Sequence, residues 1–237
     1  LADGGEGTTD SLIAGMGGTL IKLQVTGPLG LPVTASYGYL KENQTAVLEM
    51  ASAAGLTLLD HDQKNPLSAT TYGVGEMILD AIHRGARKFI VGIGGSATND
   101  GGIGMLKALG YRFFDREGKD PGEGAQALSK IASISAENVD PILSDCEFQV
   151  ACDVTNPLCG PNGATYIYGP QKGVTEKMKA PLDAAMEHYA RITAKATGTS
   201  FINTPGAGAA GGLGFAFLSY LHAALVPGID LILETVD

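Results

Sequence analysis

The stretch "KFIVGIGGSATNDGGIG", residues 88–104, constrains the fold of this 237-residue chain more than any other. Its short, branched apolar run "KFIVGI" predicts a buried strand, and "GIGMLKALG" after it predicts a helix ending at Gly110. Glycines and small polar residues lie between them. Because glycine loses more backbone entropy on folding than any other residue, such a run indicates that bare backbone must approach something closely. Strand, glycine loop and helix in this order predict an α/β unit.

The flanking sequence predicts a mixed sheet with helices. Three β-rich segments separated by the turn sequences "TGPLG" and "KENQ" predict successive strands over residues 20–25, 32–40 and 45–50. Further strands are predicted over residues 111–115 and 147–154. Residues 117–140 are expected to be an irregular excursion.

Periodic apolar residues predict the helices. The predicted helical ranges are 8–16, 72–84, 175–197 and the apolar "FAFLSYLHAAL" at 215–225. Pro181 should disturb the start of the third, since proline removes a helical hydrogen bond.

Composition excludes several classes of function. The net charge of −9 argues against a nucleic-acid partner, which requires a basic surface. The apolar runs are broken well short of the ~20 residues that cross a bilayer, so no membrane partner is expected. The chain opens without a secretory signal pattern. Three cysteines without a CxxC pair predict free thiols in a reducing cytoplasm, and the four histidines lack metal-ligand spacing.

Both ends of the chain predict a piece of a longer protein. The sequence begins at Leu1 without methionine, directly before a glycine-rich turn. It stops at Asp237, after the apolar segment "GIDLILETV".

The central loop is the first candidate site. A strand–glycine loop–helix junction suits a phosphate or carboxylate, because a helix N-terminus has unpaired N–H groups and partial positive charge. Ser96, Thr98 and Asn99 could donate further hydrogen bonds, and Asp100 could hold Mg²⁺. The alternative is a tight crossover turn in which glycine only permits packing. No GxxxxGK[ST] motif is present, which excludes a P-loop kinase.

Two acidic loops are further candidates. In "ADGGEGT" (2–8), Asp3 and Glu6 could coordinate Mg²⁺ or take a proton from a hydroxyl, or could simply favour a helix start. Asp153 follows a predicted buried strand in "ACDVTNPLCG", where ligands of open α/β sheets bind. Its alternative role is to cap its own turn.

Two remaining segments carry weaker signals. Lys172 in "GPQKG" is either a phosphate contact or a solvated lysine. The run "GAGAAG" (206–211) formally matches GxGxxG, and Gly92, Gly94 and Ala97 match its GxGxxA variant. Each match is weak, because the fingerprint requires a strand directly before the loop. A nicotinamide-dependent dehydrogenase therefore stays as a less favoured alternative.

Taken together and in order, these segments resemble the bacterial glycerate kinase family of the glucarate- and glyoxylate-pathway type. The matching runs, which cover nearly the whole chain, are "ADGGEGT", "VTGPLG", "TTYGVGE", "GIGGSATNDGG", "ACDVTNPLCGPNGA", "GPQKG" and "PGAGAAGGLG". Members of the family are longer, with an APDSFK-like segment at the start and a TGEGR-like segment near the end, and neither is present here.

The resemblance implies an α/β fold with a mixed sheet, helices and glycine-rich loops at helix N-termini. It implies that residues 19–226 form the inserted, swivelling β/β/α domain of the parent protein. Residues 1–18 would then be a flank of its Rossmann-like domain, and residues 227–237 would begin the return to it.

The resemblance also implies ATP- and Mg²⁺-dependent phosphorylation of D-glycerate, typically at the 2-hydroxyl, by a cytoplasmic enzyme that could be a homo-oligomer. The residues expected to act in catalysis are Asp3, Glu6, Asp100 and Asp153, with Asp100 and Asp153 as Mg²⁺ ligands. Those expected to bind substrate or phosphate are Gly4, Gly5, Gly7, Thr8, Gly94, Gly95, Ser96, Ala97, Thr98, Asn99, Thr155, Asn156, Lys172, Gly206, Gly208 and Gly211. The alternative for this chain alone is a non-catalytic fragment that binds anions.

Overall fold

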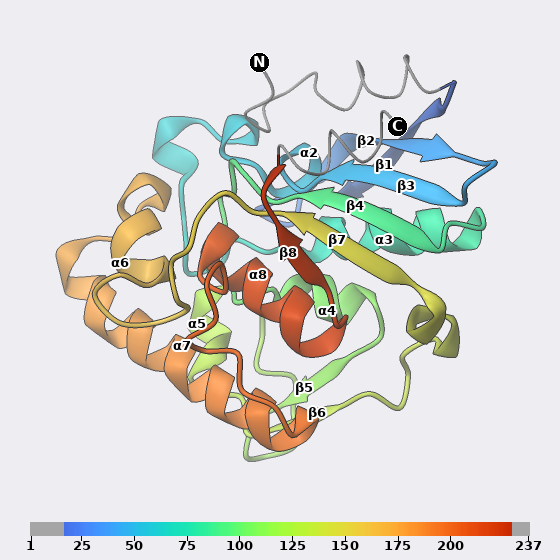
Figure 1. Ribbon diagram of the computed structural model, residues 1–237. Coiled ribbons are helices and arrows are strands. Elements are labelled where there is room, and N and C mark those ends of the chain that lie inside the picture. Colours follow the sequence, from blue (N-terminus) through green and yellow to red (C-terminus); the bar gives the residue numbers. More distant parts are fainter. Residues whose placement is uncertain (1–16, 229–237) are drawn as a thin grey trace.

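The computed structural model describes residues 17–228, which are built around one six-stranded mixed sheet (Figure 1). In spatial order its strands are β1 (Thr19–Thr26), β2 (Pro32–Leu40), β3 (Thr45–Glu49), β4 (Lys88–Gly92), β7 (Glu147–Ala151) and β8 (Ala224–Val226). The first three strands pair antiparallel, as short turns allow. The last four, from β3 to β8, run parallel to one another. The α/β fold with a mixed sheet is therefore confirmed.

Alternation along the strands determines which face of the sheet carries the main core. In β4, Phe89 and Val91 are buried in that core, whereas Lys88 is exposed and Ile90 is only partly buried. Strand β7 repeats the alternation with buried Phe148 and Val150. Phe89 and Phe148 are side by side in adjacent strands and their rings stack at 4.7 Å. Successive side chains of a strand point to opposite faces, so one face gathers the apolar residues.

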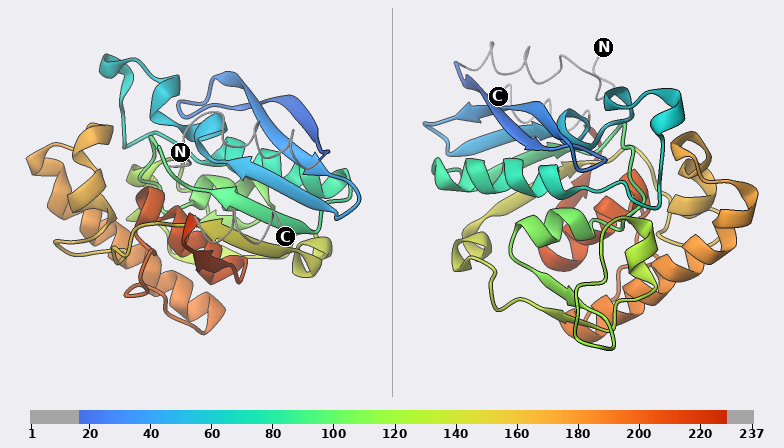
Figure 2. Two further views of the ribbon diagram at one scale, coloured as in Figure 1. Left: turned by 45° about the horizontal axis from the view of Figure 1, so that its top comes forward. Right: turned by 180° about the vertical axis from the view of Figure 1, so that it is seen from behind.

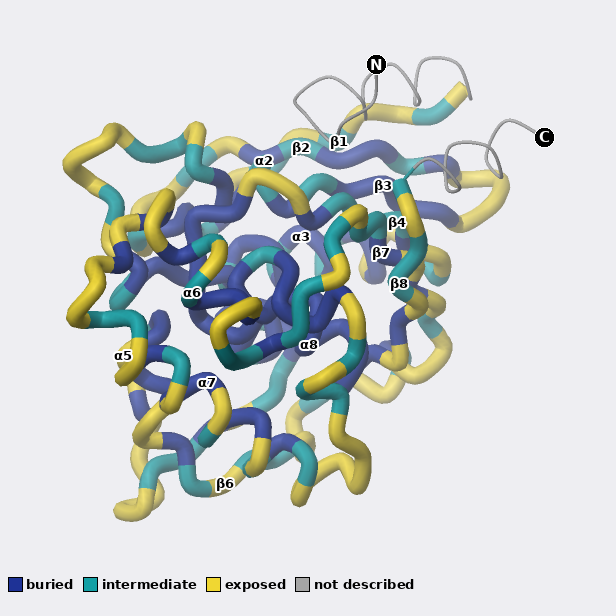
Figure 3. The backbone as a smooth tube through the Cα atoms, turned by 60° about the vertical axis from the view of Figure 1, so that its left-hand side comes forward, coloured by how far each residue is buried: buried dark blue, intermediate teal, exposed yellow. Residues whose placement is uncertain are grey.

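Three helices cover that face (Figures 1 and 2). They are α3 (Tyr72–His83), α4 (Ile103–Ala108) and α8 (Ala209–Tyr220). Helix α8 is buried almost throughout and lies at the centre of the molecule (Figure 3). Helices α3 and α4 approach closely through two glycines: a Cβ on Gly75 would collide with the carbonyl oxygen of Met105, and one on Gly104 would collide with Thr70.

The remaining elements form an outer layer and the connections. The long helix α7 (Glu176–Thr197) lies beyond α8, beside the small hairpin of β5 (Arg112–Phe114) and β6 (Ser133–Ser135). The short helices are α2 (Ala51–Ala54), α5 (Ala125–Leu128) and α6 (Ala164–Tyr168). Single 3₁₀ turns are η1 (Leu56–Leu58), η2 (His61–Gln63), η3 (Pro141–Asp145) and η4 (Pro170–Lys172). No helix within residues 17–228 is both long and apolar enough to cross a membrane.

The structure corrects several predicted boundaries. The predicted helix over 215–225 ends too late: α8 stops at Tyr220, and Ala224–Val226 form the parallel edge strand β8. Although α8 begins at Ala209, Ala210, Gly211 and Gly212 have left-handed backbone, so its regular part begins after them, close to the predicted start. The strand predicted over 147–154 ends at Ala151. Residues 117–140, expected to be irregular, contain α5 and β6.

Pro181 does not interrupt α7, which continues through it from Glu176. The helix predicted over 8–16 lies outside the described residues. The division of the chain at residues 18 and 227 stays a prediction, with β1 beginning at Thr19 and β8 ending at Val226.

The parallel strands bring their carboxyl ends to one edge of the sheet. In the register, Glu49 of β3 lies opposite Gly92 of β4, which lies opposite Ala151 of β7. Ligands of open α/β sheets bind outside this edge. The loops that follow β4 and β7 therefore emerge side by side where a ligand is expected.

Candidate active site at the carboxyl edge of the sheet

The loop after β4 begins with backbone donors that residues 17–228 leave unused. Gly94 and Gly95 are exposed, and Gly95 has a φ of 71°, which favours glycine. Carbonyl oxygens anchor this segment: Gly95 accepts from the Leu56 N–H, and Ala54 accepts from the Ala97 N–H, both at 2.9 Å. The N–H groups of Gly94, Gly95 and Ser96 make no hydrogen bond to any part of the chain in residues 17–228.

Consecutive N–H groups without partners form a cradle for an anion. This segment, residues 94–96, is called the amide cradle below. It is a feature of the loop itself and does not belong to the helix that follows.

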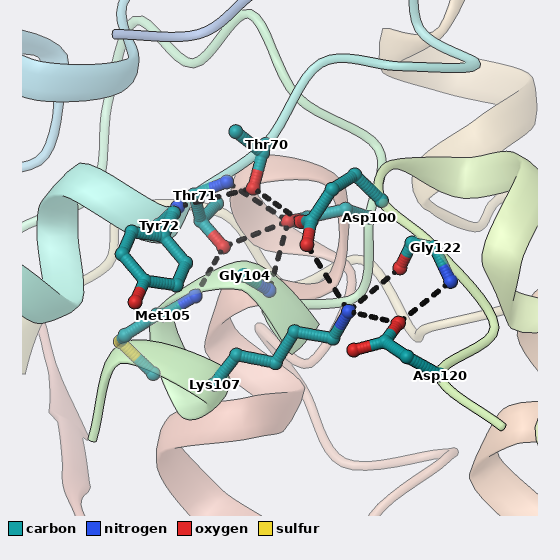
Figure 4. Close-up of polar contacts among 10 residues, drawn as sticks. Thr70, Thr71, Tyr72, Asp100, Gly104, Met105, Lys107, Asp120 and Gly122 are labelled. Carbon is teal, nitrogen blue, oxygen red and sulfur yellow. Dashed lines mark hydrogen bonds and ion pairs between the residues drawn. The ribbon is translucent and has the colours of Figure 1, made fainter. Parts of the chain in front are cut away.

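The second half of the loop is closed on itself around Asp100 (Figure 4). The side chain of Asp100 is fully buried and accepts four hydrogen bonds. Its Oδ2 accepts from the Thr71 N–H at 2.9 Å, the Thr71 hydroxyl at 2.8 Å and the Gly104 N–H at 3.2 Å, and its Oδ1 accepts from the Gly102 N–H at 3.0 Å. Burial raises the pKa of Asp100, and these hydrogen bonds oppose that rise.

This arrangement does not support the expected role of Asp100 as a Mg²⁺ ligand or catalytic group. The first amides of α4 are already bonded to Asp100, and the Met105 N–H is bonded to Thr71 at 2.9 Å. The predicted anion site at this helix N-terminus therefore has no free donor on the helix. Asp100 instead joins α4 to the start of α3.

A second set of polar contacts extends this junction (Figure 4). Lys107 of α4 donates to Asp120 at 2.7 Å, to Glu123 at 3.1 Å and to the carbonyl of Gly122 at 2.8 Å. Glu123 also accepts from the Thr70 hydroxyl at 3.1 Å. These contacts anchor the irregular segment 120–124 to both helices.

The glycines of 206–212 pack closely against other parts of the chain, and Gly211 and Gly212 pack against this loop. The Gly101 N–H donates to the carbonyl of Gly211 at 3.0 Å, and a Cβ on Gly211 would collide with the carbonyl of Thr98. A Cβ on Gly208 would collide with the carbonyl of Pro157, and one on Gly206 would lie 2.8 Å from Leu225. Close packing is thus sufficient to account for Gly206, Gly208 and Gly211 without a ligand.

Thr98 and Asn99 are fully buried between these segments. The Asn99 amide donates to the Thr165 hydroxyl at 3.0 Å. The Thr98 Oγ1 and Asn99 Oδ1 atoms have no partner within the described part of the chain. Buried oxygens of this kind are normally satisfied by ordered water or by a bound group.

Lys172 lies under the loop. It ends η4, its exposed fraction is 1%, and its ammonium donates to the Ser96 Oγ and to the Thr98 carbonyl, both at 2.6 Å. Burial lowers the pKa of Lys172 to about 7, while the Asp100 carboxylate raises it. The interpretation of Lys172 as a solvated loop lysine is wrong.

The loop after β7 starts at the same edge of the sheet as the loop after β4 and carries acidic and hydroxyl groups. Asp153 is exposed, and its Oδ1 accepts from the Gly228 N–H at 2.8 Å. Thr155 is exposed as well. Asn156 is used by the loop, since its Oδ1 accepts from the Tyr168 hydroxyl at 2.7 Å and its Nδ2 donates to the Asn162 carbonyl at 2.8 Å.

One edge residue was missed in the sequence. Glu49 ends β3 opposite Gly92, and a Cβ on Gly92 would lie 3.6 Å from its side chain. An acidic residue at the end of an apolar strand was the signal in the sequence that could have identified Glu49.

Six predicted residues lie outside the described range: Asp3, Gly4, Gly5, Glu6, Gly7 and Thr8. Residues 17–228 contain no cluster of three or more His, Cys, Asp or Glu side chains able to hold a metal.

A family model for the glycerate kinase family matches residues 1–237, the whole chain. The chain belongs to the glycerate kinase family. It is 52% identical over 237 residues to the glycerate kinase of Bacillus subtilis and 48% identical over 232 residues to the glycerate 2-kinase of Escherichia coli. A crystal structure from Salmonella typhimurium LT2 assigned as glycerate kinase 2 is 44% identical over the whole chain, with a TM-score of 0.96.

The chain spans 62% and 61% of the two relatives' lengths and 63% of the chain in that crystal structure. Family membership and the shared fold therefore describe this chain directly.

Proposed function

We propose that the protein containing this chain transfers the γ-phosphoryl group of ATP to the 2-hydroxyl of D-glycerate. The observation that carries the proposal is the amide cradle of Gly94–Ser96 at the carboxyl edge of the parallel strands. Phosphoryl transfer depends on positioning and on donors for spread negative charge more than on covalent chemistry by the protein. The three amides of the cradle, which have no partner within residues 17–228, fit a phosphoryl group or the glycerate carboxylate.

Asp153 and Thr155 are the side chains best placed to act with the cradle. Both are exposed in the loop after β7, the parallel neighbour of β4. Asp153 can accept the proton of the attacking hydroxyl, a role that requires a carboxylate within hydrogen-bond reach of the substrate. Thr155 can donate to a substrate oxygen.

A magnesium ion fits this edge in one way. Mg²⁺ keeps several waters and binds through one or two carboxylates together with substrate phosphates. Asp153 is the carboxylate that would hold it. Water and substrate phosphates would supply the other ligands, so further protein ligands are not required. When bound, the ion would neutralise charge on the transferring phosphoryl group.

The experiment follows ADP formation from ATP and D-glycerate, with enolase added to identify the product, since enolase acts on 2-phosphoglycerate and not on 3-phosphoglycerate. The enzyme is the protein completed to the length of its relatives. Enolase-competent product supports the proposal. Product that requires a mutase before enolase contradicts the 2-position, and absence of ADP contradicts the kinase.

The second candidate for the isolated chain is anion binding without turnover. It is favoured by the length comparison, because the chain spans 62% of the Bacillus subtilis relative. A transfer site must exclude water, and a cleft with one wall cannot do so. We expect the isolated chain to bind phosphate-bearing ligands weakly and not to phosphorylate glycerate. Turnover within tenfold of a full-length relative would overturn this expectation.

A further inference from the structure

Lys172 connects two parts of the chain that are far apart in sequence. It lies between α6 and α7, and its side chain reaches the loop after β4, 76 residues from Ser96 and 74 from Thr98. Both contacts are 2.6 Å long and both partners accept. Gly173 directly after it has a φ of 99°, so the chain turns sharply and leaves the lysine beneath the loop.

The lysine is paired in an unusual way for a buried cation. In the part of the chain that the structure describes, no carboxylate lies within ion-pair distance of its ammonium. Asp100, buried in the same loop, is the charged group that acts on it across a longer distance. A buried ammonium is costly unless its hydrogens are bonded. Here the partners that bond it are a hydroxyl and a carbonyl of the candidate binding loop.

The contact to Ser96 sets the direction of the serine hydroxyl. When the ammonium donates to the Ser96 Oγ, the serine proton cannot point back at the lysine, because an ammonium has no acceptor. The hydroxyl is then available as a donor elsewhere. The Ser96 N–H belongs to the amide cradle, so hydroxyl and amide of one residue can serve the same anion.

We propose that Lys172 is a positioning residue that does not touch the ligand and acts through Ser96, whose hydroxyl it orients as a donor to the anion held by the amide cradle. The proposal rests on the anion site of the proposed function and replaces direct contact between Lys172 and phosphate. It predicts that anion affinity depends on whether the lysine carries its proton.

The sign of that dependence follows from the charges. Burial lowers the pKa of Lys172 to about 7, and the facing carboxylate of Asp100 raises it. A neutral amine can accept the Ser96 proton, which turns the hydroxyl away from the cradle. A bound anion adds negative charge nearby and favours the ammonium. Anion binding should therefore take up a proton near neutral pH, and affinity should fall as the pH rises above 7.

The test uses inorganic sulfate, because it does not titrate between pH 6 and pH 9 and any proton uptake then belongs to the protein. Calorimetric titrations of the isolated chain at neutral pH are run in two buffers that differ in ionisation enthalpy. Proton uptake on binding by the wild-type chain is the expected result. Sulfate binding without proton uptake, or no sulfate binding, would overturn the proposal.

Variants separate positioning from a merely structural role. Lys172→Met should weaken sulfate binding roughly tenfold, the scale of one hydrogen bond to a charged group, and abolish proton uptake. Lys172→Arg keeps a positive charge at every pH tested. Its sulfate affinity should therefore be close to that of the wild type and should not depend on pH.

A double-mutant cycle with Ser96→Ala tests whether the two residues act as one unit. If they do, Ser96→Ala and the double variant with Lys172→Met should lose the same affinity. Additive losses contradict action through Ser96. If Lys172→Met does not fold, Lys172→Arg and Ser96→Ala decide: pH-dependent sulfate affinity in the arginine variant overturns the proposal. Sulfate binding is independent of turnover, so a failed kinase assay alone would leave this result standing.

Discussion

In the first half of the loop between β4 and α4, Gly94 and Gly95 are exposed and their N–H groups are free within the described chain. In the second half, Gly101 and Gly102, like Gly104 in the first turn of α4, are buried and each of their N–H groups has a partner. Glycines in the first half of the loop are thus exposed to solvent, whereas those in the second half are packed against protein.

The difference shows that glycine content alone does not locate a binding site. A Cβ on Gly102 would collide with Ala216, and one on Gly101 would lie 2.8 Å from the Tyr189 ring, so these positions are fixed by packing. A Cβ on Gly95 would meet only Ala51, at 3.5 Å. Substitutions in the two halves should therefore have separable effects, on stability in the second half and on ligands in the first.

Gly211→Ala should give the largest effect, on stability. Gly211 has a φ of 67°, and a Cβ would collide with the Thr98 carbonyl. Left-handed backbone and overpacking together should lower the free energy of unfolding by about 3 kcal/mol. Urea unfolding of the isolated chain measures the loss. A variant with wild-type stability would mean that the packing of Gly211 against the second half of the loop can accommodate an added methyl group.

Asp153→Asn should give the next largest effect, on turnover. If Asp153 takes the hydroxyl proton, kcat of the completed protein should fall by ~10²-fold or more. The side chain is exposed, so the unfolding midpoint should change little. Asp62→Asn, an exposed aspartate of η2, is the matched control and should keep its kcat. Near-normal turnover of Asp153→Asn would remove this residue from the site.

Asp100→Asn tests the second half of the loop without changing its volume. An amide has one acceptor oxygen, so its nitrogen would face one of the N–H donors that Asp100 now satisfies. A buried donor without a partner costs ~1–3 kcal/mol, and we expect a loss of that size in unfolding experiments. Because the Asp100 carboxylate raises the pKa of Lys172, sulfate affinity should fall at neutral pH but remain within a few-fold of the wild type at lower pH, where Lys172 keeps its proton. Affinity that stays lost at the lower pH, with unchanged stability, would restore Asp100 as a ligand group.

Local patterns predicted most of the fold. The strand over 32–40 and the helix beginning at residue 72 were found from alternation and periodicity alone. The helix predicted to reach residue 225 failed because "HAAL" is apolar enough for either state, and pairing with β7 decides in favour of a strand at Ala224–Val226. Sheet pairing is a long-range property that a local pattern does not contain.

The candidate site was less predictable for the same reason. The sequence identified the glycine loop and Lys172, but nothing local shows that Asp100 is enclosed by Thr71 or that Lys172 reaches Ser96. Both contacts join segments that lie more than twenty residues apart in the chain. Residue type predicted that these groups matter, and only the fold shows in which direction each one points.

Gly95→Val should give a modest loss of stability and a distinct loss of binding. The strained φ of 71° should cost about 1–2 kcal/mol, the usual penalty for an L-residue in left-handed backbone. Gly118→Val is the matched control, because Gly118 has a φ of 76° and nothing within 4 Å of a Cβ. The two variants should therefore unfold at similar urea concentrations. Gly95→Val alone should weaken sulfate binding, since the added side chain would lie beside the free amides. Equal sulfate affinity in both variants would mean that the exposed glycines, like the buried ones, serve the backbone only.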